Sequence, residues 1–241
     1  MHKRIVEFKG LQYPMSAFQV LLAQSASAEV RRQYEKDGEN IFETLKSSEE
    51  FQHAFLESVV SASTLYVNNT LPHVPSHCRR LLDIGCGIGL VPLLIYKAIE
   101  TDKPVLYLLD QSVTFDSLMP SDIARTGFNE TYEFSASLNV TRDFLLLNGV
   151  APEHIVLCEV GAWDIDSAEP FDCIISRKSW GFHYPIDEYL NAVSTKLTPG
   201  GVVMTDVRRG QNGIQKIESK FGSVSIISEE KKSDLIVARH A

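Results

Sequence analysis

The chain has 241 residues, of which 44% are hydrophobic and 22% are charged, and its formal net charge is −8 at pH 7. This length suits one α/β domain with an added segment and is short for two full enzyme domains. No apolar run reaches the roughly 18 residues that a membrane span requires. The acidic balance disfavours binding to nucleic acid or another polyanion.

The cysteines and the N-terminus indicate the cellular compartment. The chain contains no CxxC pair among its four cysteines, Cys78, Cys86, Cys158 and Cys173. Three of them fall in or beside strand-like apolar runs, as reduced core thiols commonly do. The first apolar patch is interrupted by Gln19 and Gln24, which fits an amphipathic helix better than a signal peptide. We therefore expect a cytoplasmic protein.

Residues 1–75 are expected to form a helical segment that serves as a lid, a substrate contact or a contact in a homodimer. The stretch 16–38 has helical character and ends in glycine, a common helix stop. A second helix should begin at Ser47 or Ser48, because serine caps free N–H groups and the two glutamates that follow suit the positive end of the helix dipole. Two prolines in 71–78 then predict a linker.

Residues 76–241 alternate apolar strand candidates with helix candidates. Near-continuous apolar runs separated by helices predict a parallel sheet that is covered on both faces. The last two runs, 223–228 and 234–240, are joined by a short polar stretch with no room for a crossover helix, so they should pair antiparallel. We expect an α/β fold: a Rossmann-like, seven-stranded, mostly parallel sheet with an antiparallel C-terminal hairpin, plus the N-terminal helical segment.

The stretch LLDIGCGIGL, residues 81–90, places three glycines at alternate positions after a strand candidate. It departs from the dinucleotide fingerprint G-x-G-x-x-G because Leu90 stands in place of the last glycine. Asp83 precedes the loop and Asp110 ends the next apolar run, where an open α/β sheet presents groups to a ligand. A tight turn that binds nothing explains the glycines alone, so their combination with two carboxylates favours a ligand site.

This combination resembles motif I of class I S-adenosylmethionine (SAM) dependent methyltransferases. The resemblance implies that the glycines let the backbone approach the amino-acid and ribose parts of SAM, and that Asp110 accepts hydrogen bonds from the ribose hydroxyls. A ligand with an ammonium, a sulfonium and a vicinal diol is served better by carboxylates than by a lysine. SAM is the expected cofactor, with S-adenosylhomocysteine (SAH) as its product. The cofactor residues that the resemblance implies are Asp83, Gly85, Cys86, Gly87, Gly89, Asp110, Gln111, Ala162, Trp163, Ser176 and Arg177.

The third strand candidate leads into VGAWD, residues 160–164. Members of the family often have Gly-Asp-Ala here, with the aspartate bonding the adenine amino group, and this chain lacks that aspartate. Either the backbone near Ala162 and Trp163 binds the adenine together with Asp164, or these residues are not the ones that correspond to the Gly-Asp-Ala of the family. Trp163 could equally be an aromatic residue at the edge of the core.

The fourth strand candidate leads into SWGFHYP, residues 179–185, which is similar to a stretch of sugar and small-molecule O-methyltransferases. Methyl transfer from a sulfonium needs an aligned acceptor and excluded water, and a hydroxyl acceptor also needs a base. His183 is the first candidate for that base because its ordinary pKa lies near neutrality, and Tyr184 is the second. The alternatives are a structural histidine and aromatic rings that pack a helix onto the sheet.

We expect no catalytic metal. His73, His77 and Cys78 have an order that suits zinc ligands, but a fourth ligand is missing nearby and the prolines favour a linker. The N-terminal helices and residues 114–137 match no motif, so acceptor choice should come from them. Several aromatic residues there could form a lid or pack in the core: Tyr13, Phe18, Tyr34, Tyr66, Phe128 and Tyr132.

The sequence thus predicts a SAM-dependent methyltransferase of a small molecule, with a hydroxyl of a sugar-like or other polar metabolite as the favoured acceptor. Nitrogen or carbon methylation of a metabolite is the alternative reaction. A regulatory SAM-binding module without catalysis is the alternative class. Methylation of protein or RNA is a third possibility, which the acidic charge disfavours. We expect no nucleic-acid partner and no membrane association.

Overall fold

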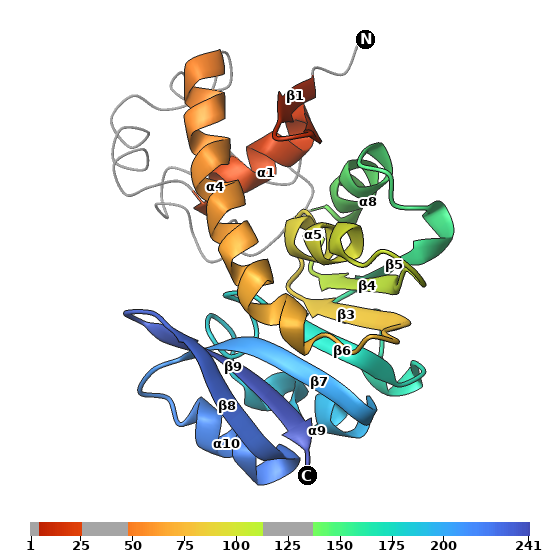
Figure 1. Ribbon diagram of the computed structural model, residues 1–241, viewed down its shortest axis with the longest axis vertical. Coiled ribbons are helices and arrows are strands. Elements are labelled where there is room, and N and C mark those ends of the chain that lie inside the picture. Colours follow the sequence, from red (N-terminus) through yellow and green to blue (C-terminus); the bar gives the residue numbers. More distant parts are fainter. Residues whose placement is uncertain (1–4, 26–47, 113–136) are drawn as a thin grey trace.

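The computed structural model describes residues 5–25, 48–112 and 137–241 (Figure 1). The strands of its main sheet are β3 (Arg80–Ile84), β4 (Val105–Asp110), β5 (Ile155–Glu159), β6 (Phe171–Ser176), β7 (Leu197–Arg208), β8 (Gly222–Glu229) and β9 (Ser233–His240). Their order across the seven-stranded sheet is β5-β4-β3-β6-β7-β9-β8. Strands β3 to β7 run parallel, and β9 pairs antiparallel with β7 and β8. The predicted Rossmann-like sheet with its antiparallel C-terminal hairpin is confirmed.

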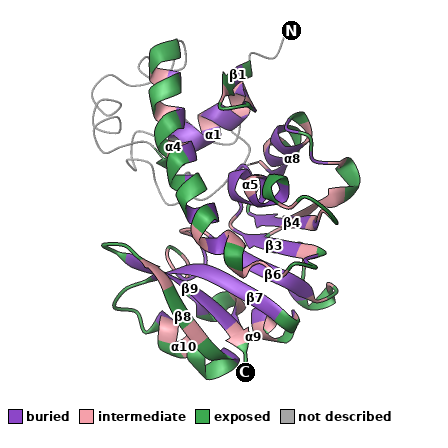
Figure 2. Ribbon diagram, viewed as in Figure 1, coloured by how far each residue is buried: buried purple, intermediate pink, exposed green. Residues whose placement is uncertain are grey.

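Helices cover both faces of this sheet (Figures 1 and 2). The helices of the described ranges are α1 (Met15–Ser25), α4 (Glu49–Thr70), α5 (Leu90–Ala98), α8 (Leu138–Leu147), α9 (Asp187–Thr195) and α10 (Gly213–Phe221). Short 3-10 turns are η1 (Leu71–His73), η3 (Pro152–His154) and η4 (Ile165–Ser167). No helix in these ranges is long and apolar enough to cross a membrane.

The alternation of side chains along each strand divides the core into two layers. Leu81 and Cys173 pack in the layer that includes residues of α1, α4, α5 and α8. Leu82 and Ile174 point the other way and pack with residues of α9 and α10. All six residues of β6 are buried, because this central strand is covered on both faces. The apolar runs in the sequence reflect this double coverage.

The N-terminal segment begins with a hairpin that the sequence reading did not anticipate. Strand β1 (Ile5–Phe8) pairs antiparallel with β2 (Leu11–Pro14). The turn between them has positive φ at Lys9 (48°) and Gly10 (73°), the conformation that suits a two-residue hairpin. A hairpin therefore precedes the predicted helices, and its strands of four residues are too short to show a clear period in the sequence.

The predicted helices that follow are found where the structure describes them. Helix α1 covers the first part of the predicted stretch 16–38, and the rest of that stretch lies outside the described residues. The side chain of Ser48 caps α4 by accepting a hydrogen bond from the Phe51 amide at 3.2 Å. Tyr13, Phe18 and Tyr66 are buried in the core layer of these helices. Of the other lid candidates, Tyr34, Phe128 and Tyr132 lie outside the described residues.

Two connections hold the N-terminal hairpin and the chain after β4 in place. The amide of Asn148 accepts a hydrogen bond from Gln12 N at 2.9 Å and donates to Gln12 O at 2.8 Å, so it clips β2 to the end of α8. The Ser112 amide donates to Glu159 Oε1 at 2.7 Å, and Ser112 Oγ accepts from the Leu138 amide at 3.3 Å. Residues on either side of 113–136 are therefore in direct contact.

We expect Asn148→Ala to lower the free energy of unfolding by about 1–3 kcal/mol, because it leaves the amide and carbonyl of Gln12 without their partner. Urea unfolding measures the change, and limited proteolysis of the hairpin should become faster. Asn191→Ala, on the exposed side of α9, is the control and should change stability by less than about 0.5 kcal/mol. Equal effects of the two substitutions would contradict the clip.

Candidate functional site

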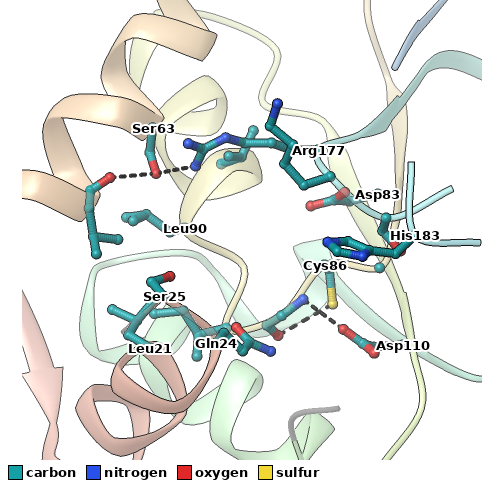
Figure 3. A pocket seen from close by; sticks show the side chains of 17 residues that line it. Leu21, Gln24, Ser25, Ser63, Asp83, Cys86, Leu90, Asp110, Arg177 and His183 are labelled. Carbon is teal, nitrogen blue, oxygen red and sulfur yellow. Dashed lines mark hydrogen bonds between the residues drawn. The ribbon is translucent and has the colours of Figure 1, made fainter. Parts of the chain in front are cut away.

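The main cavity lies at the point where the strand order reverses direction. Strands β4 and β5 lie on one side of β3, and β6 and β7 lie on the other. Open α/β sheets bind ligands at the carboxyl ends of strands at such a point. A cavity of about 470 Å³ is found there, between the loops that follow β3 and β6 and the helices α1 and α4 (Figure 3). Of the predicted site residues, it is lined by Asp83, Gly85, Cys86, Gly87, Asp110, Arg177 and His183.

The three glycines of the loop after β3 have different structural reasons. A methyl carbon on Gly85 would lie 1.9 Å from Ser179 Oγ, and one on Gly89 would lie 3.1 Å from Thr141 Cγ2. At Gly87 the nearest atom would be Oε1 of Gln24, at 3.0 Å, on a flexible side chain of α1. Close contacts within the protein thus require glycine at 85 and 89. Gly85 and Gly87 also line the cavity, so the backbone of both faces it.

Asp110 joins the end of β4 to this loop. Its Oδ2 accepts a hydrogen bond from the Gly87 amide at 2.7 Å, and its Oδ1 accepts one from the Gln111 amide at 2.8 Å. The residue is 5% exposed. Burial raises its pKa from 3.8 to about 7, repulsion by Glu159 adds to the rise, and the two amide hydrogen bonds oppose it. The carboxyl group is therefore poised between its charged and neutral forms near neutral pH.

Asp83 is the second buried carboxyl group of the cavity, and it is 3% exposed. Burial and then repulsion from Asp110 raise its pKa well above the ordinary value, whereas the positive charge of Arg177 opposes the rise. Two buried carboxyl groups in one cavity are unfavourable in their ionised forms, and the positive charge of Arg177 offsets this only in part. A bound cation would restore their charges.

Arg177 comes directly after β6 and reaches across the cavity to α4. Its Nη1 donates a hydrogen bond to Ser63 Oγ at 2.7 Å, and its guanidinium carbon lies 5.8 Å from the centre of the Tyr66 ring. The hydroxyl of Ser63 is itself held by the carbonyl of Val59, at 2.9 Å. Figure 3 shows Arg177 extending toward Ser63, away from Asp110.

The two candidate bases lie in different cavities. His183 lines the main cavity, whereas Tyr184 lines a smaller one of about 50 Å³ together with Asp110, Gln111 and Val160. Burial, followed by the positive charges of Arg208 and Lys178, lowers the pKa of His183 below 6.5. The imidazole is therefore mainly neutral at pH 7 and can accept a proton. Of the two, His183 alone lines the cavity that contains the glycine loop, Asp83 and Arg177.

Much of the aromatic stretch after β6 is structural. Trp180 is 1% exposed, and its Nε1 donates to the carbonyl of Ile186 at 2.8 Å within the core layer of α9. The Ser176 hydroxyl donates to Ile84 O at 2.7 Å and accepts from the Trp180 amide at 2.9 Å. Ser176 lines neither cavity, so it supports the loop rather than facing a ligand.

The expected adenine-reading residues also lie outside both cavities. Ala162 is exposed, and the ring of Trp163 packs 6.5 Å from that of Tyr107. The side chain of Asp164 accepts a hydrogen bond from the Asp166 amide, 2.9 Å away, in an exposed turn. Among the residues of this turn, Val160 reaches the smaller cavity.

Several lining residues were not predicted from the sequence: Leu21, Gln24, Ser25, Val59, Ser63 and Ser179. Most come from α1 and α4, for which only a general lid role was expected. The buried face of α4 does carry a signal, because polar Gln52, Ser63 and Thr70 interrupt an otherwise apolar stripe. A buried polar side chain on a helix indicates a partner or a ligand.

The described residues contain no group of three or more His, Cys, Asp or Glu side chains arranged to hold a metal ion. His73, His77 and Cys78 are not gathered into such a group. All four cysteines are free and buried.

No protein-family model matches this chain, and neither does any curated protein. Similar solved structures include a precorrin-6y methyltransferase from Geobacter metallireducens, with 17% identity over 71% of this chain and 86% of that one, at a TM-score of 0.49. A 16S rRNA methyltransferase from T. thermophilus, in complex with AdoMet and guanosine, has 15% identity over 75% of this chain and 43% of that one, at 0.49. A magnesium protoporphyrin IX methyltransferase from Synechocystis with bound SAM has 13% identity over 92% and 97%, at 0.43. These likenesses concern the fold alone.

We expect Gly85→Ala to destabilise the protein more than Gly149→Ala does. Both glycines have positive φ, 76° and 87°, which costs an alanine about 1–2 kcal/mol, but a methyl group at Gly149 meets nothing within 4 Å. The additional loss at Gly85 comes from Ser179. Denaturant unfolding should therefore show that Ser179→Gly recovers the difference in the Gly85→Ala background, and no recovery would refute the contact as its cause.

Proposed function

We propose that this protein is a SAM-dependent methyltransferase that acts on a small molecule. The observation that carries the proposal is the pair of buried carboxyl groups, Asp83 and Asp110, on either side of a glycine loop at the switch point of the sheet. Burial disfavours the ionised form of both groups. A ligand that carries an ammonium and a sulfonium would place positive charge beside them and favour that form.

The geometry supports binding of the different parts of the cofactor by different residues along the site. Asp110 would accept hydrogen bonds from the ribose hydroxyls. Gly87 would leave room for the amino-acid part of SAM. The smaller cavity next to Asp110 offers Val160 and the rings of Tyr184 and Tyr189 to an adenine. At about 50 Å³ it is small for a purine, so these side chains must shift on binding. This arrangement replaces Ala162 and Trp163 as the residues we propose for the adenine.

The cover of the cavity supports a small acceptor. Leu21 and Gln24 of α1 and Val59 and Ser63 of α4 form one wall, which fits a lid role for the N-terminal segment. SAM supplies the electrophilic methyl group, and the residues of the protein have to orient the acceptor and exclude water. We infer that the acceptor atom is a hydroxyl of a polar metabolite and that neutral His183 accepts its proton.

We also propose, from the state of its cysteines, that the protein works in a reducing compartment such as the cytoplasm. Its cysteines are free and buried. Proteins of oxidising compartments more often pair their cysteines.

We expect Asp110→Asn to weaken binding of SAM and SAH roughly 10- to 150-fold, because it replaces a charged acceptor of hydrogen bonds. Calorimetric titration measures the change. Asp102→Asn, the same substitution at an exposed position, is the control and should bind like the wild type. A folded wild-type protein that binds neither ligand would overturn the cofactor assignment.

The same titrations should depend on pH. Below pH 7 the carboxyl group of Asp110 is mainly protonated and must lose its proton to accept the ribose hydroxyls and pair with a cation. The affinity of the wild type for SAM should therefore rise between about pH 6 and pH 8 and then level off. Asp110→Asn should flatten this dependence, and what remains should come from Asp83. An affinity that falls over this range would contradict the assignment.

We expect His183→Ala to lower kcat about 100-fold at pH 7 with a hydroxyl acceptor, and the loss should shrink as the pH rises. Tyr184→Phe is the comparison, and it should have little effect on kcat if His183 is the base. Radiolabelled methyl transfer to a panel of hydroxylated and amine metabolites provides the measurement. Full activity of His183→Ala on an amine would favour nitrogen methylation, and SAM binding without turnover of any acceptor would favour a regulatory module.

A further inference from the structure

Among the cations near the carboxyl ends of β6 and β7, Arg177 lines the main cavity and forms no ion pair with a described residue. Arg208 also lacks such a pair in the described ranges, but it lies over the Phe182 ring and does not line this cavity. Lys178 pairs with Glu230 and lies 3.6 Å from Asp206, and Arg209 pairs with Glu229 and Asp234. Among the described residues, no carboxylate lies within ion-pair distance of Arg177, although the chain has a net charge of −8. An arginine that lines a cavity and has no ion pair among the described residues is suited to bind the anionic group of a ligand.

The guanidinium is held in place, but most of its hydrogen-bond donors have no acceptor among the described residues. It has five N–H donors, and within the described ranges its hydrogen-bond acceptor is Ser63 Oγ. Its central carbon lies 5.8 Å from the centre of the Tyr66 ring, and the Tyr66 hydroxyl donates a 3.4 Å hydrogen bond to the Met204 carbonyl. The remaining donors form a fork that matches the two oxygens of a carboxylate. Because Ser63 and Tyr66 already restrict the guanidinium, little conformational entropy is lost when it binds an anion.

The place of Arg177 decides which ligand it serves. In Figure 3 its guanidinium extends toward Ser63 of α4, on the opposite side of the cavity from Asp110 and its hydrogen bond to Gly87. The proposed cofactor is anchored at Asp110 and along the glycine loop. The end of the cavity next to α4 is therefore left for the acceptor.

We propose that Arg177 binds a carboxylate of the acceptor, so that the substrate class is a small hydroxylated acid. This inference rests on the proposed function and deepens it. The cofactor also carries a carboxylate at its methionine end, and it is the competing source of the same chemistry. Electrostatically, Arg177 offsets part of the negative charge of Asp83 and would make an acid acceptable in a cavity with two carboxyl groups.

The test uses the full chain saturated with SAH and titrated with propionate or with propionamide, its neutral counterpart. We expect the wild type to bind propionate at least about tenfold more tightly than propionamide. Arg177→Gln should remove this preference, and Arg177→Lys should retain part of it. Arg142→Gln, at an exposed position of α8, is the matched control and should retain it in full. Thermal unfolding verifies that each variant is folded.

A second arm identifies the source of the carboxylate. SAH and 5′-methylthioadenosine, which lacks the amino-acid part, are titrated into the wild type and Arg177→Gln. We expect the substitution to leave both affinities within about threefold, since the acceptor supplies the carboxylate. A tenfold loss for SAH alone would assign Arg177 to the cofactor and overturn the acceptor class.

The outcomes separate this inference from the proposed function. A wild type that does not bind SAH defeats the proposed function itself. A wild type that binds SAH but shows no preference for propionate over propionamide, or an equal preference in Arg177→Gln, defeats the inference about Arg177 and leaves the cofactor assignment standing.

Discussion

The hydrogen bond between the Asp110 carboxyl group and the Gly87 amide is the contact on which the site depends. Parallel strands bring their carboxyl ends to one edge of a sheet, but they do not fix the loops that follow. Here a buried side chain at the end of β4 holds the middle of the loop after β3, and backbone hydrogen bonds from Gly85 and Cys86 to Leu109 O hold its start. The two oxygens that accept hydrogen bonds from the Gly87 and Gln111 amides are those proposed to receive the ribose hydroxyls. Each oxygen has a further lone pair, so the ligand can be bound without release of the loop.

Some residues around this contact shape the loops, and others line the cavity. Gly85, Ser176 and Trp180 make contacts within the protein that shape the loops after β3 and β6. Arg177 and His183 come from the same loop after β6 but face the cavity. Some residues of the short stretch after β6 therefore pack inside the protein, and others line the cavity. Its density of aromatic and charged residues is explained by packing on one side and by the cavity on the other.

Local patterns in the sequence were enough to predict the sheet, its C-terminal hairpin, the cap of α4 and the cavity at the glycine loop. Runs of buried residues such as β6 are visible because both faces of the strand are covered. Contacts between distant segments left no such pattern. The position of Ser63 beside Arg177 and that of Gln24 beside Gly87 depend on how α1 and α4 pack, which no local period encodes. The sequence left the role of the turn at 160–164 open because a motif residue was missing, and only the geometry shows that Val160 lines the smaller cavity.

The contact between Ser112 and Leu138 gives the chain a natural point of variation. Because these two stem residues already touch, the polypeptide that joins them closes a loop whose length has little influence on the energy of the sheet. Residues can be added to or removed from that loop, or a foreign segment grafted there, while the strands keep their register. The stem also adjoins β4 and β5, where Asp110 lies. The length of this segment could therefore change while Asp110 keeps its position at the end of β4.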